Sequence, residues 1–111
     1  MRVLIIVLNN TDYLEEVLSL LVKHNVKGAT ILESQGMASS IVNNDITNIP
    51  LFGSLKTLLQ DRHPYNKTIF TVINNQEKLH KVVGAIQNLL KDERKPDGCF
   101  MFTVPVGETF C

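Results

Sequence analysis

The sequence lacks several features that would point at once to a class of function. Its 111 residues carry eleven basic and eleven acidic side chains, so the formal net charge is zero. No basic stripe of the kind that binds nucleic acid stands out. No apolar run approaches the roughly 18–20 residues that span a bilayer. The apolar run Val3–Leu8 has no small-residue cleavage site after it, so it predicts a buried strand rather than a signal peptide.

Cysteine and catalytic motifs are scarce as well. The chain has two cysteines, Cys99 and Cys111, which we expect to be free thiols in a reducing, cytoplasmic compartment. The sequence shows no glycine-rich phosphate motif, no serine elbow and no carboxylate pair of recognisable spacing. These absences favour binding over catalysis, so we expect a protein that is not an enzyme and uses no cofactor.

What is present is enough apolar material for one packed domain. Hydrophobic residues make up 44% of the chain, which argues against disorder. The length suits a single domain covering residues 1–111. A chain this short leaves apolar surface near water, so oligomerisation is an ordinary way for it to gain stability.

One pattern occurs twice, at a constant offset of 65 residues (72 − 7). Residues 7–18 and 72–83 each read as the end of a strand, an Asn-Asn pair and the start of an amphipathic helix. The paired asparagines are suited to capping the helices that follow. Apolar residues at helical spacing predict that each helix packs one stripe against a sheet. Those residues are Leu14, Val17, Leu18, Leu21, and then Leu79, Val82, Val83, Ile86, Leu90.

A second strand follows each helix, from Gly28 to Glu33 and from Gly98 to Val104. The order is therefore strand–helix–strand, repeated. We predict an α/β (α+β) fold, a ferredoxin-like βαββαβ sandwich whose four-stranded antiparallel sheet carries both helices on one face.

The connection between the two halves is expected to hold a flexible loop and a short helix. Residues 36–49 are rich in short polar side chains, asparagine in particular, which is typical of an exposed loop. A short extra helix is predicted over residues 55–61, with leucines on one side. These leucines, or alternatively a subunit interface, would cover the open face of the sheet.

Three segments resemble the PII-like signalling proteins, the broad family around the nitrogen-regulatory PII proteins. Residues 26–33 are similar to the family's passage from the first helix to the second strand. Gly36 stands where the family's long T-loop begins. Residues 97–106, Asp-Gly-Cys-Phe-Met-Phe-Thr-Val-Pro-Val, are similar to its final Gly-Asp-Gly-Lys-Ile-Phe-Val-x-Pro-Val segment.

The resemblance implies a homotrimeric regulatory protein. Clefts between its subunits would bind a small anionic effector, such as an adenine nucleotide, and the 36–49 loop would signal to a protein target. Neither nucleic acid nor membrane insertion is expected. When the family's ligand-binding positions are transferred to this sequence and neighbouring residues are added, the resemblance implies one set of candidate ligand-binding residues. They are Thr30, Gly36, Met37, Lys95, Asp97, Gly98 and Cys99.

The sequence departs from the family pattern where phosphates would be held. Cys99 replaces the lysine of the final segment, Ala38-Ser39 replaces an Arg-Gln pair, and no basic residue follows Pro105-Val106. Each hydrogen bond to a charged group contributes on the order of 1.5–3 kcal/mol. The binding free energy of a micromolar site is only about 8 kcal/mol in total, so the loss of several such contacts removes much of it. ATP is therefore not expected in the family's usual pose.

Two alternatives stay open from the residues alone. The chain is either the sensor described above or a ferredoxin-like or ACT-type interaction module without a ligand. Cys99 is interpreted as a core residue rather than a redox-active nucleophile. The three histidines, His24, His63 and His80, do not show zinc-ligand spacing and are interpreted as unrelated surface residues.

Overall fold

A computed structural model describes residues 1–37, 65–91 and 98–111 of the chain. The elements follow the order β1 (Arg2–Leu8), η1 (Thr11–Tyr13), α1 (Leu14–Lys23), β2 (Thr30–Gln35), β3 (Tyr65–Ile73), α4 (Gln76–Leu90) and β4 (Cys99–Pro105). The predicted extra helix, most of the predicted loop, His63, Lys95 and Asp97 lie outside the described residues. Within those residues, no helix has both the length and the apolar character needed to cross a membrane.

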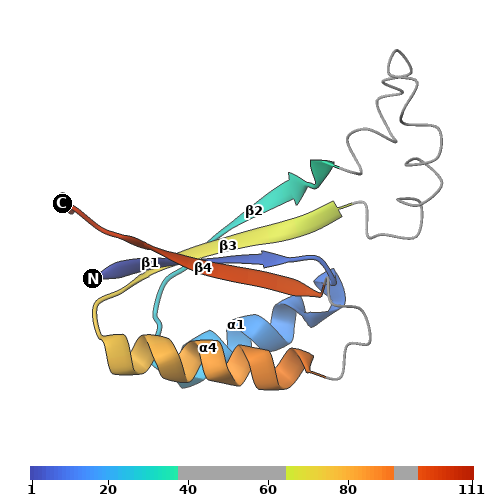
Figure 1. The fold of residues 1–111 in the computed structure, drawn as a ribbon, viewed down its shortest axis with the longest axis horizontal. Coiled ribbons are helices and arrows are strands. Elements are labelled where there is room, and N and C mark those ends of the chain that lie inside the picture. Colours follow the sequence, from blue (N-terminus) through green and yellow to red (C-terminus); the bar gives the residue numbers. More distant parts are fainter. Residues whose placement is uncertain (38–64, 92–97) are drawn as a thin grey trace, which may run out of the picture.

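The four strands form one antiparallel sheet in the order β2-β3-β1-β4. The two central strands pair in the register Ile6 to Ile69, and β4 pairs with β1 so that Met101 lies opposite Ile6. On the other side, Ile31 of β2 lies opposite Ile69. Figure 1 shows α1 and α4 together on one side of this sheet. The predicted antiparallel α+β arrangement is confirmed, and it is compatible with a ferredoxin-like fold.

The duplication predicted from sequence appears as two interleaved units, β1-α1-β2 and β3-α4-β4. The second strand of each unit pairs with the first strand of the other, since β2 joins β3 and β4 joins β1. Neither unit therefore completes its own sheet, and the halves depend on each other for their backbone hydrogen bonds.

The second asparagine of each pair caps the helical segment that follows it, which is the short helix η1 in the first half and α4 in the second. The helix α1, which continues from η1, begins without a side-chain cap. Oδ1 of Asn10 accepts a hydrogen bond from the backbone N–H of Asp12 at 3.2 Å. Oδ1 of Asn75 accepts one from the N–H of Lys78 at 3.1 Å. Each side chain satisfies a donor that the first helical turn leaves without a partner.

The core lies between the helices and the facing side of the sheet. Alternate residues of β1 and β3 point into it, as does one stripe of each helix, which agrees with the predicted periodicity. Its buried apolar residues are Leu4, Ile6, Leu8, Val17, Leu21, Val26, Ile69, Ile73, Leu79, Val82, Ile86 and Leu90.

The second strand begins slightly later than the sequence suggested. It starts at Thr30 rather than Gly28 and continues to Gln35. The carbonyl of Gly28 instead accepts a hydrogen bond from the side-chain hydroxyl of Thr71, 2.5 Å away. The strand ends just before Gly36, where the sequence predicted the start of the loop.

Candidate functional site

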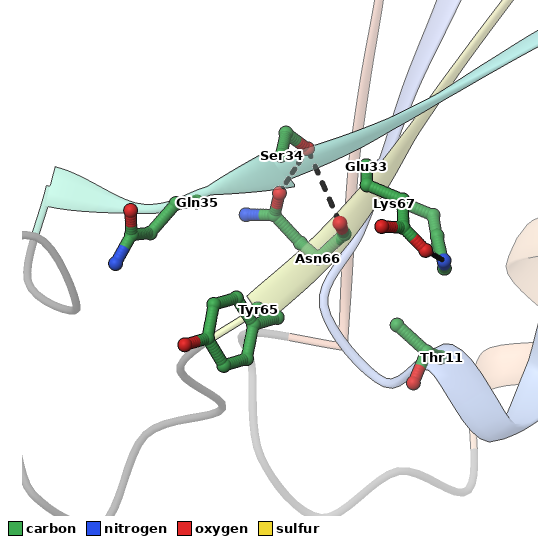
Figure 2. Close-up of a pocket in the computed structure, with 7 residues that line it drawn as sticks. All are labelled: Thr11, Glu33, Ser34, Gln35, Tyr65, Asn66 and Lys67. Atoms are coloured by element: carbon green, nitrogen blue, oxygen red, sulfur yellow. Dashed lines mark hydrogen bonds and ion pairs between the residues drawn. The ribbon is translucent and has the colours of Figure 1, made fainter.

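A hollow of about 600 Å³ lies at the end of the sheet where β2 finishes and β3 begins. Its volume is within the range of small-molecule pockets. Figure 2 shows side chains from β2, β3 and the start of η1 around it. The lining residues are Thr11, Glu33, Ser34, Gln35, Tyr65, Asn66 and Lys67.

The strand pairing explains why these residues meet although they are far apart in sequence. Glu33 lies opposite Lys67, Ser34 opposite Asn66, and Gln35 opposite Tyr65. The turn after β1 then brings Thr11 to the same end of the sheet, as Figure 2 shows. Residues from both halves of the chain therefore share one hollow.

An ion pair joins the two strands on one side of the hollow. Nζ of Lys67 lies 2.5 Å from Oε1 of Glu33. The hydrogen bond from Lys67, and then its charge, lower the pKa of the Glu33 carboxyl from its ordinary value. The Glu33 side chain is largely exposed, so the pair is screened by solvent and holds Lys67 only loosely.

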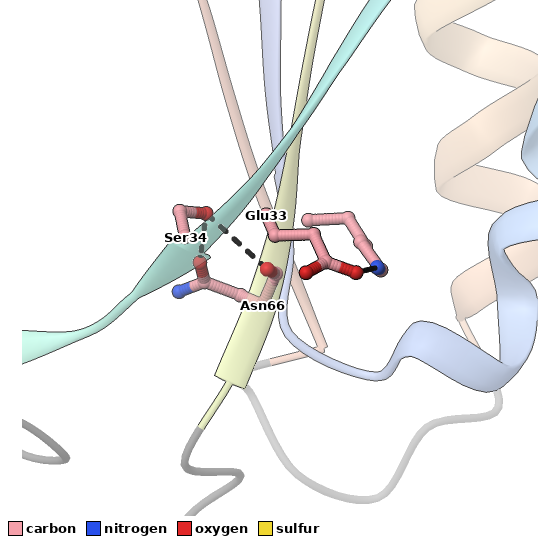
Figure 3. A network of polar contacts seen from close by, with 4 residues as sticks. Glu33, Ser34 and Asn66 are labelled. Carbon is pink, nitrogen blue, oxygen red and sulfur yellow. Dashed lines mark hydrogen bonds and ion pairs between the residues drawn. The ribbon is translucent and has the colours of Figure 1, made fainter.

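A network of neutral polar groups joins the same strands on the opposite face (Figure 3). The Ser34 hydroxyl contacts the side-chain and backbone oxygens of Asn66, as Figure 3 shows. The same hydroxyl lies 2.7 Å from Oγ1 of Thr68. The amide nitrogen of Asn66 donates to Oδ1 of Asn9 at 3.3 Å. Among the described residues, every buried side-chain nitrogen and oxygen has a hydrogen-bond partner. The network therefore fixes the ends of three strands without an unpaired polar atom.

The residues suggested by the resemblance fall at two different edges of the sheet. Gly36 and Met37 follow β2 at one edge, whereas Gly98 and Cys99 start β4 at the other. All four lie at the same end of the sheet as the hollow. Two strands separate them, however, so within one chain they are about 14 Å apart, or three strand spacings. Thr30 starts β2 opposite Phe70 and lies away from this end.

The two glycines Gly98 and Gly36 differ in the contacts that surround them. The buried Gly98 accepts hydrogen bonds at its carbonyl from the N–H groups of Asn9 and Asn10, at 3.0 and 3.4 Å. It thereby ties the start of β4 to the first asparagine pair. Among the described residues, a Cβ added at Gly36 would meet only the side-chain amide nitrogen of Asn66, at an ordinary 3.9 Å. These described neighbours do not require a glycine at position 36.

Cys99 is half-buried and packs against the core. Burial raises the pKa of its thiol to about 11. The thiol is therefore protonated at neutral pH, which makes it a poor nucleophile and favours the structural interpretation over the redox one. Among the described residues, no three His, Cys, Asp or Glu side chains are grouped closely enough to hold a metal ion.

Sequence reasoning missed most of the hollow. From the sequence, Glu33 was expected only to end a strand, and no binding role was expected for Thr11, Tyr65 or Lys67. The proximity of Glu33, Tyr65 and Lys67 follows from the β2–β3 register, which a 29-residue connection (residues 36–64) conceals in the sequence. No protein-family model matches the chain, and no match is found among curated proteins.

Proposed function

We propose that this chain is a non-enzymatic, PII-like regulatory protein of the cytoplasm that works as a homotrimer. It binds a small anionic effector in clefts between subunits and regulates a partner protein through the 36–49 loop. The main support is the position of the hollow. Gln35 lines it just before residues 36–64, and Tyr65 lines it just after them. An effector bound here contacts both ends of the connecting segment.

The chemistry of the hollow suits a small anion with a flat apolar part. Lys67 supplies a cation, Thr11 a hydroxyl group and Tyr65 an exposed aromatic ring. Glu33 competes with the effector for Lys67, but solvent screens this exposed ion pair and makes it weak. A phosphate that accepts a charge-assisted hydrogen bond therefore displaces the Glu33 carboxylate at little cost.

A site between subunits accounts for the distribution of the candidate residues. Gly36 and Met37 lie at one edge of the sheet, with two strands between them and Gly98 and Cys99 of the same chain. When copies are arranged side by side, the β2 edge of one faces the β4 edge of the next. Residues of both edges then border the same cleft, next to the hollow.

Thermal unfolding with a panel of adenine nucleotides and cyclic dinucleotides tests this proposal. A ligand at 100 times its Kd stabilises the native state by about 2.7 kcal/mol. For a domain of this size, that raises Tm by roughly 10 °C. We expect at least one member of the panel to produce such a rise, and no change in Tm at millimolar concentration with any of them would refute the effector site.

A matched pair of lysine variants locates the site. Lys67 pairs with Glu33, and Lys81 pairs with Glu77 at 3.4 Å on the surface of α4, away from the hollow. Lys67→Gln is expected to reduce the ligand-induced rise in Tm by more than half, whereas Lys81→Gln leaves it unchanged. Equal rises in the two variants would show that the effector binds elsewhere.

A further inference from the structure

A second hollow, of about 450 Å³, lies where β1 begins, β4 ends and α4 begins. Figure 1 shows these parts of the chain on the side of the picture marked by the N-terminus. In the β1–β3 register, Arg2 at this hollow is six positions from the residue that pairs with Lys67, so about 20 Å separates the two cations. The described residues that border segments 38–64 and 92–97 all lie at the other end of the sheet and of α4. The second hollow is therefore distinct from the effector site proposed above.

This hollow exists because the helices cover the edge strand β4 less completely than the central strands. Met101 lies opposite Ile6 and Thr103 lies opposite Leu4, so both residues of β4 share the helix-facing side of the sheet. Leu4 and Ile6 are fully buried there, whereas Met101 and Thr103 are only half-buried. The inner side of β4 next to the first turns of α4 is therefore open to a ligand, and we call this hollow the α4–β4 groove.

Much of the α4–β4 groove is lined by apolar side chains. They come from all three elements and are Leu4, Leu79, Val83, Met101 and Phe102. Leu4 and Leu79 belong to the buried core, and Val83 and Met101 pack against it. These residues therefore hold the groove in shape without a ligand. A preformed, largely apolar hollow with a few polar groups is the usual form of a small-molecule site, and its volume is within the range of such sites.

The polar side chains of the groove all carry hydrogen-bond donors, and none is acidic. They are Arg2, Gln76, His80 and Thr103. Within residues 1–37, 65–91 and 98–111, no hydrogen bond or ion pair involves the side chain of Arg2 or His80. The acidic residue in the first turn of α4, Glu77, pairs with Lys81 instead. The positive charge of Arg2 at the groove is therefore not balanced by a carboxylate of the described residues.

The combination of one unpaired cation, neutral donors and an apolar lining determines the class of ligand. A guanidinium group binds a carboxylate through two parallel hydrogen bonds. The single charge of a carboxylate also matches the one arginine of the groove, whereas a phosphate monoester carries a charge of about −1.5 to −2. We infer that the α4–β4 groove binds a small carboxylate with an apolar body. This inference goes beyond the proposed function and does not depend on it.

Titration of isotope-labelled protein with 3-phenylpropanoate, followed through the backbone amide signals, tests the inference. The neutral 3-phenylpropanamide is the matched control, because it has the same apolar body without the charge. We expect saturable changes with 3-phenylpropanoate at Gln76, His80 and Thr103, which line the groove. The carboxylate should bind about tenfold more tightly than the amide, which is the effect of one hydrogen bond between charged groups.

A pair of variants assigns the binding to Arg2. Arg2→Gln and Lys27→Gln each remove one positive charge from an exposed residue, and Lys27 lies between α1 and β2, outside the groove. Arg2→Gln is expected to weaken the binding of 3-phenylpropanoate about tenfold, whereas Lys27→Gln leaves it unchanged. Equal affinities of the two variants overturn the inference. So do equal affinities of the wild-type protein for the two probes, a comparison that needs no variant. The absence of saturable changes at millimolar probe, or changes centred on Thr11 and Lys67, also overturns it.

Discussion

Val17 and Val82 offer a direct comparison of the two halves. They are equivalent at the 65-residue offset, both are fully buried, and each sits in the middle of its helix stripe. Truncation to alanine removes two methyl groups, worth about 1.6 kcal/mol of transfer free energy, and leaves a cavity that adds to the loss. The higher helix propensity of alanine offsets about 0.5 kcal/mol of this loss in stability. We therefore expect Val17→Ala and Val82→Ala each to lower the free energy of unfolding by about 2 kcal/mol.

Urea denaturation followed by circular dichroism measures this effect, with all variants at one protein concentration because association raises apparent stability. With a slope of about 1–2 kcal/mol/M, the midpoint should fall by about 1–2 M in both variants. Val22→Ala is the matched control, since Val22 lies on α1 with 71% of its surface exposed, and its midpoint should stay level or rise slightly. Midpoints of Val17→Ala and Val82→Ala close to wild type, or a large loss in only one of them, would refute the reasoning that both halves form one core.

Three further predictions concern single residues. Asn25 has a positive φ of 62° after α1, so Asn25→Gly should raise the free energy of unfolding by a few tenths to 1 kcal/mol in the same urea assay. If Asn25→Gly is less stable than wild type, the strain at this position has been overestimated. Asn75→Ala should cost about 1 kcal/mol, because it removes the cap on the N–H of Lys78, and an unchanged midpoint would contradict that role. A disulfide reagent at pH 8 should modify the exposed Cys111 quickly and Cys99 slowly, because burial raises the pKa of the Cys99 thiol to about 11. The rate of modification at Cys99 should increase as the pH approaches that value. Equal rates for the two cysteines at pH 8 would argue against the burial of Cys99.

The fold was largely predictable from the sequence because its signals are local. Asn10 caps the short helix η1 that leads into α1, and Asn75 caps α4. The apolar spacing identified residues such as Val17 and Val82 that are buried. A strand was expected from Gly98 to Val104, and the structure has one from Cys99 to Pro105. The arrangement of strands then followed from the duplicated order, since two such units are commonly combined in one antiparallel sheet.

The hollow was not predictable, because it depends on register rather than on local pattern. A shift of one residue between β2 and β3 would turn Glu33 and Lys67 to opposite faces of the sheet. The resemblance to PII-like proteins supplied candidate residues at both edges of the sheet, but it did not indicate how far apart these residues lie within one chain.

Chemical-shift mapping tests the central claim that the effector binds at the β2–β3 end of the sheet. The nucleotide that gives the largest rise in Tm would be titrated into isotope-labelled protein while backbone amide signals are followed. The largest changes are expected at Thr11, Gln35, Tyr65 and Lys67, which line the hollow. Saturable changes that leave these four signals in place and centre on another part of the chain would contradict the account.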